Sequence, residues 1–193
     1  IANLKGGSTA EIKTDSSNGN KYLELYSVMS DETKIGAEWR YRTGKKFDNQ
    51  TVEITFDIMK PESYASAEVM LYNLVGGSTS NGSSFGTLAK FTNDGKIQIF
   101  GNDYATYDTT TWYNFKFLLS AQKGYVECQM KAATDTAYVH VGTFPVKLSS
   151  KEVDDITVVF KQNRYETGSS LYIDNANIIE SNEVVAQGED FST

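Results

Sequence analysis

The sequence has few of the residues that histidine- or cysteine-based sites require. Its 193 residues contain a single cysteine, Cys128, and a single histidine, His140. One cysteine excludes an intrachain disulfide, and one histidine excludes a zinc site built from several histidines. A Ser-His-Asp triad would depend on His140 alone, and the alternation around it places this side chain on the polar side of a strand. We expect Cys128 in the core and His140 at the surface.

Long apolar runs are also missing. No stretch approaches the roughly 18 apolar residues of a membrane span. The first residues lack the basic-then-apolar pattern of a signal peptide, so we expect Ile1 to be an internal boundary rather than a native start. With 18 basic and 25 acidic residues the formal charge is −7. This charge opposes binding to nucleic acid or anionic lipid.

What the sequence does contain is strand-like alternation, clearest in Thr51–Lys60, where apolar residues occupy every second position. Turn signals such as Asn18-Gly19 and Lys123-Gly124 separate many of the runs, and no long 3.6-residue pattern is present. Short runs with this alternation occur at 21–28, 35–43, 51–60, 67–75, 87–92, 96–100, 112–119, 124–131, 137–143, 154–161 and 170–180. About a dozen short strands without helices predict an all-β fold, a two-sheet antiparallel sandwich or barrel.

The predicted strands fit one domain. The polar stretch 76–84 has strands on both sides, and neither half has enough strands for a sandwich, so we interpret it as a loop. We expect a single module over residues 1–181 and a tail, or the start of a following module, over 182–193.

Sugar binding requires exposed aromatic rings beside amides, carboxylates or arginines. In the strand 36–42, alternation groups Glu38, Arg40 and Arg42 on one face and the aromatic residues on the other. One interpretation is a solvated charged face over a core. The other is an arginine-bearing groove wall, suited to an acidic polysaccharide.

Two turn-rich segments add further candidates. Tyr104 and Tyr107 lie among Asn and Asp in 100–108, which we interpret as a loop with at least one exposed tyrosine. Arg164 and Tyr165 repeat this mixture in 162–166. Trp112 begins a strand, where a structural role is the favoured interpretation.

Three motifs resemble a known family. Thr111–Phe117, then Gly124-Tyr125-Val126, then Leu171–Asn175 are similar to the closing half of concanavalin A-like jelly-roll modules. Such modules accompany bacterial polysaccharide-degrading enzymes, including pectate lyases, and the likeness covers roughly residues 20–180. It implies a jelly roll that acts as a carbohydrate-binding module or laminin-G-like domain of a secreted bacterial protein. A polysaccharide and a catalytic domain of the same polypeptide are then the expected partners.

The resemblance also implies a structural Ca²⁺, because related modules use the aspartate of the closing strand as a ligand. Asp174 matches that position, and Glu189 or Asp190 in the tail could complete the site. An edge-strand aspartate bonded to a neighbouring backbone group is the alternative. Simple alternation would place Ala176 and Ile178 on the same face as Asp174.

The sequence thus predicts a non-catalytic carbohydrate-binding module, and its arginines suggest an acidic, pectin-like polysaccharide as the ligand. The lone histidine and the lack of a Glu-x-Asp-x-x-Glu arrangement argue against catalysis. Two alternatives stay open. One is a polysaccharide lyase or glycoside hydrolase on the same scaffold, and the other is a cell-surface adhesion or spacer domain.

Overall fold

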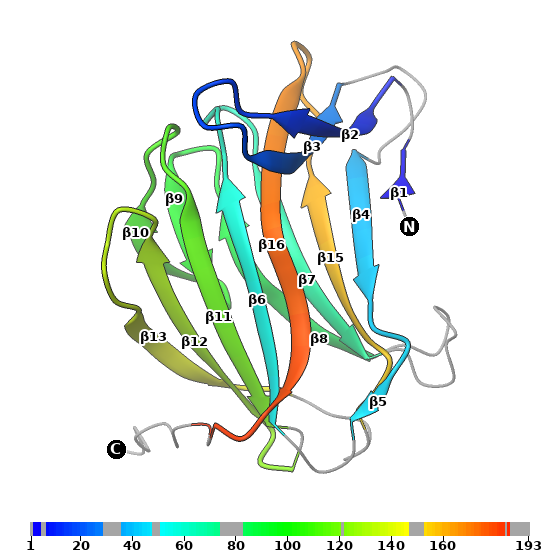
Figure 1. Ribbon diagram of the computed structural model, residues 1–193, viewed down its shortest axis with the longest axis vertical. Helices are drawn as coiled ribbons and strands as arrows, with labels where there is room; N and C mark the ends of the chain where they lie inside the picture. Colours follow the sequence, from blue (N-terminus) through cyan, green and yellow to red (C-terminus); the bar gives the residue numbers. More distant parts are fainter. Residues whose placement is uncertain are drawn as a thin grey trace.

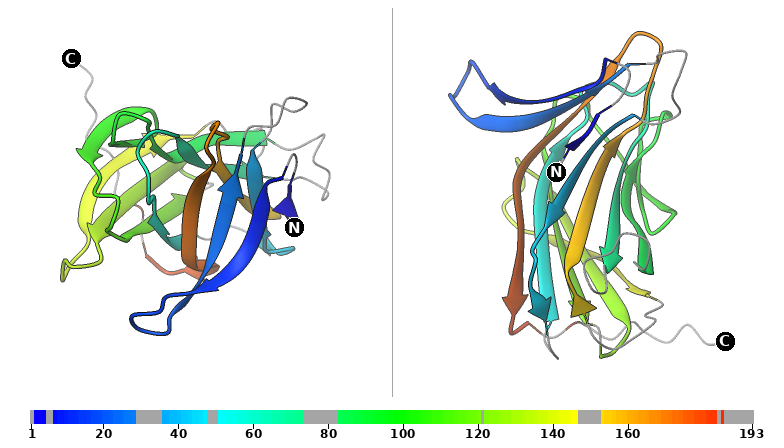
Figure 2. Two further views of the ribbon diagram at one scale, coloured as in Figure 1. Left: turned by 90° about the horizontal axis from the view of Figure 1, so that it is seen from above. Right: turned by 90° about the vertical axis from the view of Figure 1, so that its right-hand side faces the viewer.

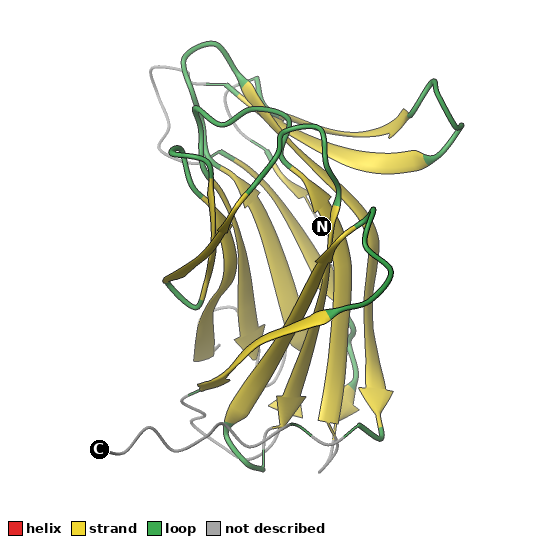
Figure 3. Cartoon of the chain, turned by 90° about the vertical axis from the view of Figure 1, so that its left-hand side faces the viewer, coloured by secondary structure: helices red, strands yellow, loops and turns green. Residues whose placement is uncertain are grey.

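The computed structural model describes residues 2–4, 7–28, 36–47, 51–73, 83–120, 122–146, 153–183 and 185. These residues form two facing β-sheets, seen as front and back layers in Figure 1 and from the side in Figure 3. None of the described residues forms a helix long and apolar enough to cross a membrane. The predicted all-β, two-sheet antiparallel sandwich is confirmed.

Each main sheet has seven strands, and all their pairings are antiparallel. Sheet A runs in the order β1 (Ala2–Asn3), β4 (Ala37–Arg42), β15 (Ile156–Gln162), β7 (Ala67–Asn73), β8 (Ser83–Phe91), β9 (Lys96–Ile99) and β10 (Asn102–Thr106). Sheet B runs in the order β13 (Val139–Pro145), β12 (Tyr125–Ala132), β11 (Tyr113–Ser120), β6 (Thr51–Met59), β16 (Ser169–Ser181), β3 (Lys21–Ser27) and β2 (Thr9–Thr14). A further short pair joins β5 (Lys46–Phe47) to β14 (Val153–Asp154).

Two strands longer than two residues, β2 and β10, were not predicted from the sequence. β2 has only two apolar side chains in six positions, Ala10 and Ile12, so its alternation is weak. The predicted loop 100–108 is wrong in part, because Asn102–Thr106 forms the edge strand β10, paired with β9 across an irregular register. An edge strand has only one partner and needs no apolar face. Its composition can therefore resemble that of a turn. Residues 76–82 of the predicted loop 76–84 lie outside the described residues, and 83–84 belong to β8 rather than to a loop.

The core lies between the inner faces of the two sheets. The ring centroid of Phe56 lies 5.3 Å from that of Phe115 and 5.7 Å from that of Phe117, both on β11. It lies 5.2 Å from the ring centroid of Phe160 on the opposite sheet. Burying each such ring contributes about 1.5–3 kcal/mol. Cys128 is fully buried in this core, as expected, and burial raises the pKa of its thiol well above its usual value.

The outer face of sheet B is concave. The β2–β3 hairpin leans outward from one end of the sheet, and the β13 edge bends toward the same side (Figure 2). On the central strand β6, Glu53, Thr55 and Asp57 alternate with fully buried apolar residues and so face this concavity. Side chains of the strands beside β6 with the same register share that face.

A β-bulge in β16 changes which residues face the concavity. Asp174 is opposite Asp57, but the next pair in register is Asn177 with Thr55. Two residues of β16 therefore oppose the single residue Phe56 of β6, so one residue is inserted. Asn175 adopts a left-handed conformation with φ of 50°. The expected alternation is therefore wrong beyond Asp174: Ile178 is 8% exposed and belongs to the core, as does the packing partner Ala176.

Candidate functional site

A row of polar side chains crosses the concave face of sheet B at the level of the bulge. Asn114 on β11 is directly opposite Asp57 on β6, and Asp57 is directly opposite Asp174 on β16. Side chains opposite one another in an antiparallel pair lie about 4.5–5.5 Å apart at Cβ. The row therefore places an amide and two carboxylates side by side across three adjacent strands.

An aromatic cluster borders this row. Tyr22 on β3 lies with its ring centroid 4.6 Å from that of Tyr172 on β16 and 5.8 Å from that of Trp112, which directly precedes β11. The Trp112 and Tyr172 rings are 6.5 Å apart. Burial, with a contribution from Glu24, raises the pKa of Tyr172 to about 12, so its hydroxyl stays protonated and able to donate a hydrogen bond.

The polar row lines a recess of about 160 Å³ together with two rings of the cluster, Tyr22 and Trp112. We call this recess the groove pocket. The turn between β2 and β3 supplies its outer wall. Its lining is Asp15, Asn18, Asn20, Tyr22, Asp57, Trp112, Asn114, Ala133, Asp174 and Asn175. Rings and short polar side chains thus alternate around one concave surface.

Amide groups hold the two facing carboxylates in place. Asn175 Nδ2 donates to Asp57 Oδ2 at 2.6 Å, and Asn20 Nδ2 donates to Asp174 Oδ2 at 2.7 Å. The other Asp174 oxygen accepts the backbone N–H of Asn175 at 2.8 Å. Like charges directly opposite each other destabilise a sheet, and these donors offset that repulsion.

Asn175 supports the site in two separable ways, through its backbone conformation and through its amide. We expect Asn175→Gly to leave the melting temperature nearly unchanged, because glycine tolerates a positive φ, but to weaken binding in the groove. Asn175→Val should also cost about 1–3 kcal/mol of folding stability, because a β-branched residue is strained there. Thermal melts and ligand titrations of both variants measure the two effects. Equal stabilities of the glycine and valine variants would contradict this assignment.

The opposite wall of the concavity comes from the turn between β12 and β13. Tyr138 is 40% exposed, and its ring centroid lies 5.4 Å from the ammonium of Lys131. Burial raises the pKa of Tyr138, and the nearby carboxylates of Asp57 and Glu53 raise it further while Lys116 opposes them. Tyr138 is therefore an exposed ring beside β13, at the edge of sheet B opposite to the β2–β3 hairpin.

The arginine-bearing face of β4 lies elsewhere. Arg40 pairs with Glu38 at 3.4 Å and Arg42 pairs with Asp155. The intervening Trp39 stacks on Phe160 at 5.3 Å, which places the aromatic side of β4 toward the interior. Glu38, Arg40 and Arg42 therefore belong to the outer face of sheet A, and the structure does not bring them to the concave groove.

The other predicted sugar-binding residues are dispersed. Tyr104 lies on β10, at the far edge of sheet A, and is 40% exposed. Tyr107 is buried, donates to the Thr92 carbonyl at 3.0 Å and has its pKa raised to about 12 by burial, so its ring is not an open platform.

Arg164 and Tyr165 lie between β15 and β16. Tyr165 is 39% exposed and its ring centroid is 4.6 Å from that of Tyr64. This tyrosine pair lies outside the groove pocket.

The residues around Asp174 do not form a metal centre by themselves. Its carboxylate already accepts hydrogen bonds from Asn20 and from the Asn175 backbone. Among the residues that the structure describes, no group of three or more His, Cys, Asp or Glu side chains could hold a metal ion. Glu189 and Asp190 lie outside the described residues, so the calcium site remains a prediction.

Five residues at or beside the concave face were not predicted from the sequence: Tyr22, Asp57, Asn114, Tyr138 and Tyr172. The alternation of Thr51–Lys60 does place Asp57 on a polar face, which is the one signal that pointed to this site. His140 lies on the exposed surface as expected, 3.2 Å from Glu127.

Comparisons with known proteins identify the fold but no family. No protein-family model matches the sequence, and no curated protein matches it either.

Among solved structures, the chain is similar to a sialidase (TM-score 0.58, 13% identity), with 92% of this chain covering 18% of that one. It is similar to the catalytic domain of a glycoside hydrolase family 131 protein from Coprinopsis cinerea (TM-score 0.52, 13% identity; 89% and 75% of the two chains). It is also similar to a Bacteroides ovatus mixed linkage glucan GH16 protein in complex with a G4G4G3G product (TM-score 0.54, 8% identity; 88% and 85%). The chain has the concanavalin A-like jelly-roll fold of these structures.

Proposed function

We propose that this chain is a non-catalytic carbohydrate-binding module that holds a neutral polysaccharide in the concave groove of sheet B. The observation that carries the proposal is the aromatic cluster of Tyr22, Trp112 and Tyr172 beside the row Asn114, Asp57 and Asp174. Flat rings can cover the C–H faces of sugar rings, amides can donate hydrogen bonds to sugar hydroxyls and accept them, and carboxylates can accept them. The similarity of the fold to two glycoside hydrolases supports carbohydrate as the ligand class.

The charge of the groove favours a neutral glycan over the acidic one that the sequence suggested. Asp15, Asp57 and Asp174 all line the groove pocket, and a uronate would meet like charge there. The nearby ammonium of Lys116 is already paired with Glu53 at 3.4 Å and with Glu183. Of the three arginines that suggested an acidic polysaccharide, Arg40 and Arg42 lie on the other sheet and Arg164 lies between β15 and β16.

One observation favours hydrolysis as a second candidate function. Asp57 and Asp174 face each other across adjacent strands, and retaining glycosidases use two carboxyl groups about 5–5.5 Å apart. A hydrolase on this scaffold would require one of the two to donate a proton. Both instead accept amide hydrogen bonds, which suits a binding role better.

Three further expectations belong to this proposal. The module is secreted, it serves a catalytic domain of the same polypeptide, and Asp174 binds a structural Ca²⁺ with Glu189 or Asp190. Hard carboxylate oxygens are the ligands that Ca²⁺ prefers. Melting in calcium and in EDTA tests the ion, and equal melting temperatures would overturn that part.

Affinity electrophoresis across neutral and acidic polysaccharides tests the main proposal. We expect retardation by at least one neutral glucan, xylan or fructan and weaker or no retardation by pectin, with no release of reducing ends. Retardation by none of the polysaccharides would overturn the binding function. Release of new reducing ends, lost in Asp57→Asn, would replace it with hydrolysis.

A further inference from the structure

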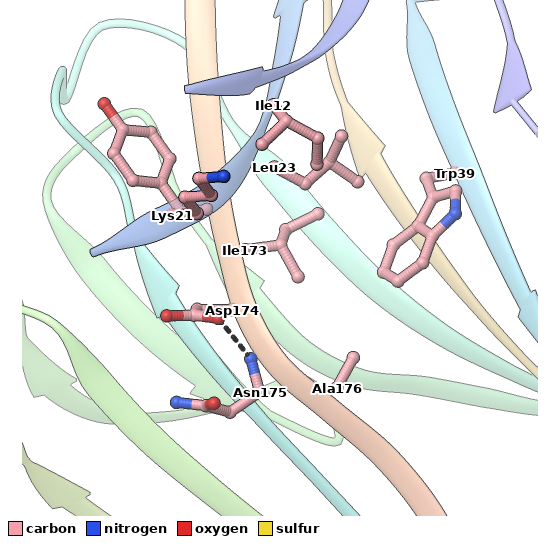
Figure 4. Close-up of a pocket in the computed structure, with 9 residues that line it drawn as sticks. Ile12, Lys21, Leu23, Trp39, Ile173, Asp174, Asn175 and Ala176 are labelled. Atoms are coloured by element: carbon pink, nitrogen blue, oxygen red, sulfur yellow. Dashed lines mark hydrogen bonds between the residues drawn. The ribbon is translucent and has the colours of Figure 1, made fainter. Parts of the chain in front are cut away.

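A second pocket lies on the other side of the β16 bulge. It has a volume of about 300 Å³ and opens between the β2–β3 hairpin, β16 and β4 (Figure 4). Apolar side chains from all of these strands form its wall. Its lining is Ile12, Lys21, Tyr22, Leu23, Trp39, Ile173, Asp174, Asn175 and Ala176. We call it the hairpin pocket.

The hairpin pocket exists because the β2–β3 hairpin leans away from the sandwich (Figure 2). Ile12 is paired in register with Leu23 and therefore shares its core-facing side, yet Ile12 is 68% exposed. On the facing sheet, Trp39 is opposite Ala2 in the two-residue edge strand β1. The inner side of the hairpin is thus apolar without being closed off, which is unusual for a large aliphatic residue on the core side of a strand.

The hairpin pocket and the groove pocket meet at the bulge. Three residues line both of them: Tyr22, Asp174 and Asn175. The β16–β3 pairing ends with Ile173 opposite Leu23, just before the bulge. In Figure 4 the Asp174 and Asn175 side chains lie to one side of β16, and Ile12, Leu23 and Trp39 lie to the other. A ligand in the groove therefore lies directly beside the mouth of the apolar pocket.

We propose that the hairpin pocket receives an aromatic ring carried as a substituent by the glycan that occupies the groove. This inference rests on the proposed function of the groove. A dry apolar cavity of about 150 Å³ is enough to bind benzene, and the hairpin pocket is larger than that. Its polar residues, Lys21, Asp174 and Asn175, are at the side shared with or next to the groove, where the sugar end of such a ligand would lie.

The shape of the wall favours an aromatic ring over a flexible chain. The Trp39 indole is a flat surface that is held in place by stacking on Phe160 at 5.3 Å and 22°. A flat ring on the ligand would contact the flat Trp39 indole over a large area, in an offset-stacked or edge-to-face arrangement. The aliphatic side chains of Ile12, Leu23 and Ile173 complete a slot around that surface.

The chain contains two tryptophans, one in each pocket, which allows the two sites to be observed separately. In Trp112→Phe the remaining indole, Trp39, reports on the hairpin pocket. In Trp39→Phe the remaining indole, Trp112, reports on the groove. The probes are benzyl alcohol alone, and the methyl and phenyl β-glycosides of one neutral oligosaccharide, prepared from the polysaccharide that retards the protein most.

We expect benzyl alcohol and the phenyl glycoside, but not the methyl glycoside, to shift Trp39 emission. Both glycosides should shift Trp112 emission. The phenyl glycoside should bind about tenfold more tightly than the methyl glycoside, the gain expected from burying one apolar ring. Ile12→Ser should abolish this gain. Val139→Ser is the matched control, because Val139 is 56% exposed on the other edge strand of sheet B and should leave the gain intact.

The outcomes separate this inference from the function of the groove. If the methyl glycoside binds and the phenyl glycoside binds no better, or the gain survives Ile12→Ser, the hairpin pocket inference fails and the groove proposal stands. If benzyl alcohol shifts Trp39 but neither glycoside shifts Trp112, the glycan-binding function fails. Trp39 emission that depends on protein concentration without ligand would assign the pocket to a second copy of the chain and overturn the inference.

Discussion

Replacing Trp112 with alanine is expected to weaken glycan binding by about 10- to 100-fold, equivalent to about 1.4–2.8 kcal/mol. Trp112 has the largest ring in the groove pocket, and it is partly exposed beside Asn114. Interface energy concentrates in such aromatic anchors, because they cover a large apolar area while losing little side-chain entropy. Isothermal titration with the neutral oligosaccharide from the electrophoresis screen measures the change in dissociation constant.

Two variants make this result interpretable. Trp112→Phe keeps a smaller ring and should lose only part of the affinity. Tyr104→Ala removes a ring that is 40% exposed on β10, at the far edge of sheet A, and should leave affinity unchanged. An equal loss in Tyr104→Ala would place the glycan on sheet A instead, where the sequence analysis had also sought it. A thermal melt of each variant confirms that the fold is retained.

The fold was largely predictable because it depends on local pattern. In β6, four buried apolar residues alternate with polar ones, and this period alone specifies a strand with one core face. Similar alternation marks β11, β12 and β15. The edge strands β2 and β10 were not predicted, because a strand with one partner and little burial needs no apolar alternation.

The site was not predictable in the same way, because it is assembled by register. Tyr22, Trp112 and Tyr172 are far apart in the sequence and meet only because β3, β11 and β16 belong to one sheet. The bulge at Asn175 decides which side chains of β16 face the concavity, and no local sequence pattern indicates the one inserted residue.

The role of the charged residues Arg40 and Arg42 was misinterpreted for a related reason. Arg40 and Arg42 stand out in the sequence, yet the acid that pairs with Arg42 is Asp155, more than a hundred residues away. A charged residue looks available for a ligand until its partner is known, and that partner is set by strand order. Trp112 was misinterpreted in the opposite way. A tryptophan at the start of a strand suggests a structural role until the neighbouring strands show which side it faces, and Trp112 lines the groove pocket.

Neutralising Glu62 is expected to cost about 3–5 kcal/mol of folding stability, the usual loss when one partner of a buried ion pair is removed. The ammonium of Lys60 is fully buried, 3.1 Å from Glu62 Oε2 and 2.8 Å from Ser169 Oγ. In Glu62→Gln that ammonium would remain buried without its anion. Urea or thermal unfolding measures the loss. The control is Glu68→Gln, which breaks the more exposed Glu68–Lys161 pair at 3.2 Å and should cost less than about 1 kcal/mol.

The same variant should change how stability depends on pH. Burial lowers the pKa of Lys60 below 10.5 in the folded protein, and Glu62 opposes that shift. Between the folded and the unfolded pKa the unfolded chain binds more protons, so folding stability rises with pH across that window. Without Glu62 the folded pKa falls further and the window extends to lower pH. The melting temperature of Glu62→Gln, relative to wild type, should therefore rise as the pH increases toward 10.5, while that of Glu68→Gln should not. Parallel pH profiles for Glu62→Gln and wild type would show that Lys60 does not depend on Glu62 for its charge. The large loss of stability would then have to arise from the hydrogen bonds of Glu62 to Ser169 and Ser170 instead.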